Sequence, residues 1–342
     1  MGSVYFWNLV YLHNLKSASD PRDKVLGLLG LADPLEYEHF SPDYTLEVHE
    51  VYETVFRLMI KEYTAKIYPD LDFLIGTWFS LQSLPADHVD PNPASIHHLP
   101  SWVANFARKM DTDTRLCQEH RLAQSDMIYN VSSGRHPSIT FGDNPCTLRL
   151  MGVKVATINT LSPIELEYQK SLTRARIEVS LSSAERINGK FNDAERRSFW
   201  RVIMGGLIDV SDNSGRTEWI FTYKKVTDAD TLHFDTYYFG QDEDNGIDPH
   251  FSGHITFSIK YACSGRSFFM TEDRAMGLCP LGTKIGDEVW ILHGGNVPFI
   301  LRHCEEEHGR YHAFVGDCYM DGIMFGEAMN EDTPEGQEVI LR

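Results

Sequence analysis

The fold is decided by the stretch from Phe268 to Glu327, which reads FFMTEDRAMGLCPLGTKIGDEVWILHGGNVPFILRHCEEEHGRYHAFVGDCYMDGIMFGE. Short apolar runs, such as Glu288–Leu292 and Tyr311–Val315, alternate there with turn residues such as Gly294-Gly295. Short runs separated by Gly, Asn and Asp are typical of hairpins, and several in succession are typical of a barrel or a curled sheet. The stretch therefore predicts a β-rich region.

Helices are predicted on the N-terminal side of this region. Asp20 can cap a helix, and Pro21 fits its first position, where the missing N–H costs nothing. Residues 45–63 predict a second helix, because apolar side chains recur there every three or four residues. That apolar face consists of Val48, Val51, Tyr52, Val55, Phe56, Met59 and Tyr63.

The middle of the chain mixes both kinds of pattern. Residues 148–158 alternate as a hairpin around Met151-Gly152, and residues 194–208 form an amphipathic helix. Residues 226–250 combine an aromatic run with an acidic, glycine-containing loop, which predicts a mobile surface segment.

We therefore expect a single α+β domain over residues 1–342. A helical part, residues 1–125, packs on a mostly antiparallel sheet or small β-barrel within residues 126–342. A helical insertion at about residues 165–209 lies against that sheet.

Composition narrows the class of protein. The net charge of −18 argues against a nucleic-acid partner or an anionic membrane, because both need clustered Lys and Arg. No apolar run has the length of a membrane-spanning helix, so no membrane insertion is expected. Six cysteines without a CxxC pair indicate free thiols in a reducing compartment, and we expect a cytoplasmic protein.

The common catalytic and cofactor motifs are absent from the sequence. His97-His98 and His303-Cys304 with His308 lack the spacing of metal ligands on a defined element, so we expect no metal and no cofactor. Asp287 and Asp317 follow glycines and are interpreted as turn-capping residues. Any cysteine could pair with a histidine for covalent catalysis, but the sequence singles out no pair.

Five segments resemble fungal heterokaryon-incompatibility (HET) proteins, and they keep the order of that family. They are SASDPRDKVLGLLGLA (17–32), LPSWV (99–103), FWRVIM (199–204), GDEVWILHGGNVPFILR (286–302) and YHAFVGDCYMDGIMFGEAM (311–329). The N-terminal half of the HET domain, with its ALSYxWG-type motif, has no counterpart in this chain. The resemblance implies a role in non-self recognition and programmed cell death.

Two functional hypotheses remain open. The first is a cofactor-independent enzyme of fungal secondary metabolism, similar to the norbornene-forming Diels–Alderase of sordarin-type pathways, that shapes a small apolar substrate for cyclisation, isomerisation or a Diels–Alder-type pericyclic step. The second is a heterokaryon-incompatibility regulator without catalysis, with a protein partner or as a homo-oligomer.

Aromatic side chains are the candidate binding residues for a small apolar molecule, because they are large and rigid and several carry a polar tip. The residues expected to border the missing half of the HET domain, or to flank the proline-rich loop, are Tyr5, Trp7, Tyr11, His13, Trp78 and Trp102. The run Tyr237–Phe239 is the candidate lid.

Overall fold

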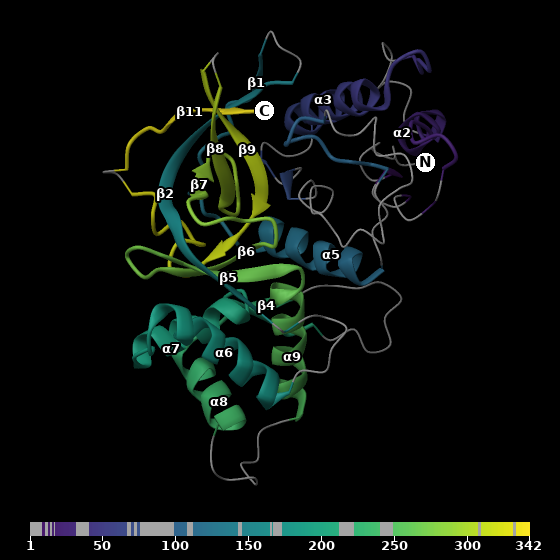
Figure 1. Cartoon of the computed structure of the whole chain (residues 1–342). Helices are drawn as coiled ribbons and strands as arrows, with labels where there is room; N and C mark the ends of the chain where they lie inside the picture. The colour runs from purple at the N-terminus through teal and green to yellow at the C-terminus, as the bar shows by residue number, and fades with distance from the viewer. Residues whose placement is uncertain are drawn as a thin grey trace.

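Five strands close into a mixed β-barrel (Figure 1). The computed structural model describes residues 9–10, 13, 16, 18–31, 41–66, 70–71, 74–75, 99–107, 112–142, 146–164, 166, 173–211, 222–239, 249–306, 309–330 and 333–342, and the structural statements below concern these residues. The barrel strands are β2 (Leu148–Pro163), β7 (Glu288–Leu292), β8 (Phe299–Glu306), β9 (Gly309–Asp317) and β11 (Gln337–Leu341). Their neighbours run antiparallel except β11 and β9, which pair in parallel at Leu341 and His312. The predicted α+β class with a small barrel is confirmed.

Strand β2 is the longest strand described, with 16 residues, and it pairs with three others in turn. Residues 148–152 pair with β11, residues 152–157 with β7, and residues 158–163 with β5. The register shifts between Lys154 and Ala156 and again between Ile158 and Thr160. Such bulges bend a strand and increase its twist, which allows one strand to serve two sheets.

The predicted hairpin around Met151-Gly152 is wrong, because β2 passes through these residues without turning. Glycine is needed at position 152 for packing. A Cβ there would lie 2.8 Å from Leu292 Cδ2 and 2.9 Å from the carbonyl oxygen of Ile291. The glycine that suggested a turn therefore lies at a close approach of β7 to β2.

The second half of β2 carries an outer sheet. It consists of β5 (Arg266–Thr271), β6 (Met276–Pro280) and β10 (Tyr319–Met320), which pair antiparallel in the order β2-β5-β6-β10. Because β10 directly follows barrel strand β9 along the chain, the outer sheet and the barrel are joined at both ends. Short strand β1 (Thr140–Phe141) adds to the start of β2.

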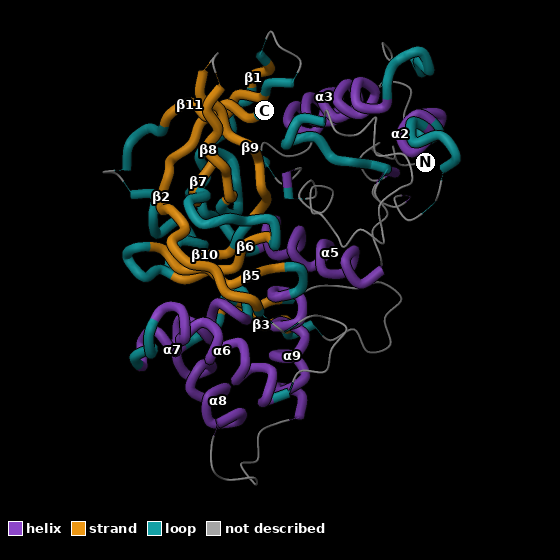
Figure 2. Tube along the Cα trace, in the orientation of Figure 1, coloured by secondary structure: helices purple, strands orange, loops and turns teal. Residues whose placement is uncertain are grey.

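Helices lie on two sides of this β structure (Figure 2). On the N-terminal side are α2 (Asp23–Leu26), the 3-10 turn η1 (Leu29–Leu31) and α3 (Val48–Lys66), and α5 (Thr112–Met127) follows them. The predicted helix over residues 45–63 is confirmed as α3. The expected capping by Asp20, with Pro21 in the first helical position, is wrong, because α2 begins at Asp23 with Arg22 as its N-cap. The carboxylate of Asp20 instead accepts a hydrogen bond from the backbone N–H of Arg22 at 2.9 Å, in the turn before the helix.

The other helices are α6 (Arg174–Asn188), α7 (Asp193–Ile203), α8 (Asp228–Phe239) and α9 (Pro249–Cys263), with β3 (Leu207–Asp209) and β4 (Tyr223–Lys225) between them. They cover the outer sheet and extend well past residue 209. The mobile surface segment predicted from residue 226 is wrong over α8. Phe234 is 1% exposed and packs with its ring centroid 4.9 Å from that of Trp200, so residues 228–239 form a helix that packs on the core.

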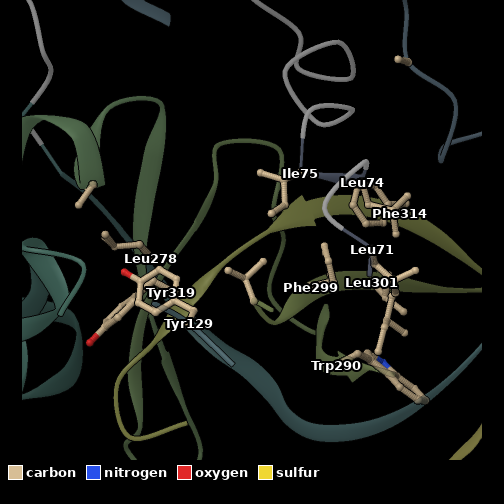
Figure 3. Packing of buried hydrophobic residues seen from close by; sticks show 14 of the residues in the cluster. Leu71, Leu74, Ile75, Tyr129, Leu278, Trp290, Phe299, Leu301, Phe314 and Tyr319 are labelled. Carbon is tan, nitrogen blue, oxygen red and sulfur yellow. The ribbon is translucent and has the colours of Figure 1, made fainter. Parts of the chain in front are cut away.

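Both faces of barrel strand β7 are buried. In β7, Trp290 and Leu292 belong to the large core cluster, whereas Val289 and Ile291 belong to a second one. The large cluster continues into the N-terminal part, because Leu71 and Leu74 belong to it together with Phe314 (Figure 3). None of the helices described in the structure is both long enough and apolar enough to cross a membrane.

We expect the substitution Gly152→Ala to destabilise the protein by roughly 1–3 kcal/mol, because the added methyl overpacks the contact between β2 and β7. Urea unfolding measures this change. Gly253→Ala is the matched control, since Gly253 lies in α9 with nothing within 4 Å of an added Cβ. Alanine there should be neutral or stabilise by about 0.5–1 kcal/mol. Equal losses in both variants would contradict this account of Gly152.

Candidate functional site

A group of charged side chains is buried where α5, β5 and β9 meet. Arg121 is 4% exposed, Arg266 is 6% exposed and Asp317 is 2% exposed. We call these three residues the buried charge cluster. Charged side chains are almost never fully buried unless they are paired, so the cluster marks a place where the fold holds polar chemistry in its interior.

Each member of the cluster links separate elements. Arg266, the first residue of β5, donates a hydrogen bond from Nη2 to Oδ2 of Asp317, the last residue of β9. Arg121 on α5 donates from Nη2 to the backbone carbonyls of Tyr261, at 3.3 Å, and Ser264. These carbonyls belong to the end of α9, where helix carbonyls lack intrahelical partners and attract a cation. The cluster thus ties the outer sheet to the barrel, and α5 to α9.

Burial governs the protonation of these groups. It lowers the pKa of Arg121 to about 9, with the positive charge of Arg266 adding to the effect and Asp317 opposing it. Burial also raises the pKa of Tyr129, whose hydroxyl donates to the carbonyl of Gly205. Arg121 therefore remains cationic at neutral pH, and Tyr129 remains a neutral phenol.

A small cavity of about 20 Å³ opens beside the cluster. It is lined by Ile75, Arg121, Gln124, Tyr129, Gly205, Ala262, Arg266, Val297, Asp317, Cys318, Tyr319 and Met324. Figure 3 shows Tyr129 and Tyr319 side by side, with their ring centroids 6.4 Å apart. A cavity of this volume has room for one water molecule and is too small for a metabolite.

A second polar group lies next to the cluster on α5. The ring of His120 stacks on that of Tyr261 at 3.5 Å between centroids, and its Nδ1 lies in hydrogen-bond contact, 2.9 Å, with the hydroxyl of Tyr223. An oxygen of Asp209 lies 3.9 Å from the same nitrogen. Burial lowers the pKa of His120 to about 4, and Asp209 opposes the shift. His120 is therefore held neutral in the folded protein.

The buried thiols near these groups are not activated. Burial raises the pKa of Cys279 to about 12 and raises the pKa of Cys263 and Cys318. A nucleophilic cysteine needs a lowered pKa, so these three are packing residues. Among the residues that the structure describes, no group of three or more His, Cys, Asp or Glu side chains is placed to hold a metal ion.

Most of the predicted binding residues lie outside the described part of the chain. This holds for Tyr5, Trp7, Tyr11 and Trp78. His13 is half-buried, and Trp102 is fully buried, with its Nε1 donating to the carbonyl of Cys146 at 3.1 Å. Neither lines the cavity. At the predicted lid, the ring of Phe239 stacks on that of Trp200 at 5.4 Å, and the side chains of residues 237 and 238 are not described.

The buried charge cluster itself was missed from the sequence. The interpretation of Asp317 as a turn cap is wrong, since its carboxylate pairs with Arg266 in the interior. Asp287 does cap a turn, because its Oδ2 accepts the backbone N–H of Lys284 at 2.7 Å, and it also pairs with Arg302. The one sequence signal for the cluster is Arg266 at the head of the apolar run of β5.

Comparison with known proteins identifies the β-rich part. Residues 246–338 match the Het-6 beta-barrel domain. The chain is 24% identical to the Neurospora crassa protein "Heterokaryon incompatibility protein 6, OR allele", in an alignment that covers 94% of this chain and 51% of the relative. The chain thus spans about half the length of that relative. No solved structure matches.

The chain is therefore similar to the Het-6 beta-barrel domain over residues 246–338, and it is distantly similar to heterokaryon incompatibility protein 6 over most of its length. The matched residues include β5 to β10 and the first residues of β11. Strand β2 lies upstream of them, so the closed barrel needs a strand from outside the matched segment.

We expect Asp317→Ala to cost roughly 3–5 kcal/mol of stability, because it leaves Arg266 charged and without its anion in the interior. The double variant Arg266→Met/Asp317→Leu should be markedly more stable than Asp317→Ala, since it removes both buried charges and keeps the apolar volume. Urea unfolding of the wild type, of Arg266→Met, of Asp317→Leu and of the double variant measures the coupling. Losses that simply add would show that the two residues do not act as a pair.

We expect the protein to lose stability as the pH falls from about 6.5 to about 4. The folded pKa of His120 lies below its unfolded value of 6.5, so the unfolded chain binds the proton more tightly in this window. The variant His120→Gln should lose about 1–2 kcal/mol less than the wild type between pH 7 and pH 5. Denaturant unfolding at both values tests this, with pH 8 as the reference at which His120 is neutral in both states. Identical pH dependence in the two proteins would contradict it.

Proposed function

We propose that this chain acts in heterokaryon incompatibility, as a regulator that works by binding another protein rather than by catalysis. The observation that carries the proposal is the alignment of 94% of the chain with heterokaryon incompatibility protein 6. The similarity extends beyond the barrel into the helical part of the chain. This extent favours a shared function over a shared fold alone.

The described interior supports a binding role. The buried charge cluster joins secondary-structure elements to one another, and the cavity beside it has the volume of one water molecule. The thiols of Cys263, Cys279 and Cys318 stay protonated because burial raises their pKa. These buried groups stabilise the fold. We therefore expect a partner protein to bind at the surface of the molecule.

The turn between β6 and β7 is the surface that we would test first. Leu281 is 59% exposed and Ile285 is 66% exposed, and the turn between them is held by hydrogen bonds. Arg302 donates to the carbonyl of Gly282 at 2.8 Å and pairs with Asp287, which caps the turn. Apolar side chains on a rigid turn lose little conformational entropy when a partner covers them.

Expression of the chain in Neurospora crassa strains that differ at their incompatibility loci tests the proposal. We expect death of fused cells, scored with a vital dye, in some genotypes and not in others. The variant Leu281→Ser/Ile285→Ser should reduce this death at an unchanged protein level. Leu232→Ser is the matched control, because Leu232 is 65% exposed on α8, on the helical side of the molecule.

Absence of genotype-dependent death in strains that contain the folded protein would overturn the proposal. An equal effect of Leu281→Ser/Ile285→Ser and Leu232→Ser would remove the turn as the contact surface. Immunoblots and thermal unfolding of the purified variants establish that each protein is present and folded.

The cofactor-free cyclase stays a prediction. Its substrate would need a pocket larger than the described cavity, and four of the six aromatic candidates lie outside the described residues. Mass spectrometry of small-molecule extracts from the producing fungus and from a strain lacking the gene distinguishes the two functions. A precursor that accumulates and is converted by the purified protein without added cofactor would favour the enzyme.

A further inference from the structure

The ion pair in the buried charge cluster leaves one donor and one acceptor to be satisfied. Arg266 uses Nη2 and Asp317 uses Oδ2 in their mutual hydrogen bond. Within the described part of the chain, Nε of Arg266 and Oδ1 of Asp317 are buried and have no protein partner. A buried polar group without a hydrogen bond costs about 1–3 kcal/mol, and more when it is charged.

The cavity lies against both residues. Arg266 and Asp317 line it together with Gln124, which is 5% exposed, and the hydroxyl-bearing rings of Tyr129 and Tyr319. Its volume of about 20 Å³ exceeds the 10–15 Å³ or so that one water requires. Internal waters occupy sites of this kind, which are polar, roomy enough and offer two or more hydrogen-bond partners.

We propose that this cavity is a binding site for one internal water molecule, which accepts a hydrogen bond from Arg266 Nε–H and donates one to Asp317 Oδ1. The two atoms have opposite requirements, and water meets both because it donates as well as accepts. A halide ion would satisfy the guanidinium but would face the carboxylate with like charge. An apolar guest would satisfy neither atom.

The water completes the link between the outer sheet and the barrel. Arg266 begins β5 and Asp317 ends β9, so a water held by both belongs to the same joint as their direct hydrogen bond. Gln124 and Tyr129 bring α5 and its C-terminal side to the same cavity.

Nuclear magnetic resonance of the ¹⁵N-labelled full chain in ordinary water tests the site. The Arg266 Nε–H signal is assigned by its loss in the variant Arg266→Lys, which keeps the positive charge but has no guanidinium. We expect a cross-peak between this signal and water, with the sign of a water that tumbles with the protein. A signal with no such cross-peak would overturn the proposal.

A crystal of the same chain soaked in sodium bromide distinguishes water from an anion. We expect electron density for one oxygen atom between Arg266 Nε and Asp317 Oδ1, with no anomalous signal from bromide. An anomalous peak in the cavity would replace the water by an anion and overturn the proposal. A cavity without density would overturn it as well.

Discussion

Strand β2 is the part of the structure on which the other strands depend, because its backbone forms hydrogen bonds with three partners in succession. Its first residues close the barrel through β11 and β7, and its last residues start the outer sheet through β5. Backbone groups buried in a core must be paired, so β2 cannot be shortened without leaving β5 or β7 unpaired. The two bulges let one strand follow both sheets.

The joint between the two sheets is polar, although the core around it is apolar. Arg266 and Asp317 connect the outer sheet to the barrel at the end of β9, directly before the chain enters β10. Burying this pair gains little net stability over an apolar pair of the same size, but removal of either partner is costly. We infer that the pair favours one alignment of the outer sheet relative to the barrel over other alignments.

The segment that matches the Het-6 beta-barrel domain and the closed barrel of the structure have different boundaries. The matched barrel domain begins in α9, whereas the closed barrel includes β2, which lies about one hundred residues earlier and belongs to neither the matched segment nor the helical insertion. Helices α6 to α9 are therefore inserted between strands of one β structure. The barrel therefore closes only with residues from 148 onward, which lie well before the matched segment.

The sequence by itself determined the α+β class, helix α3 and most of the strands after residue 268, because these follow from local periodicity and turn residues. Strand β7 coincides with its predicted range, Glu288–Leu292. Local patterns could not show that Gly152 marks a close approach of two strands, or that Phe234 of α8 packs against Trp200. Local patterns also could not predict the pairing of Arg266 with Asp317, which lie 51 residues apart in the sequence. Only the tertiary structure decided these points, since each depends on contacts between segments distant in sequence.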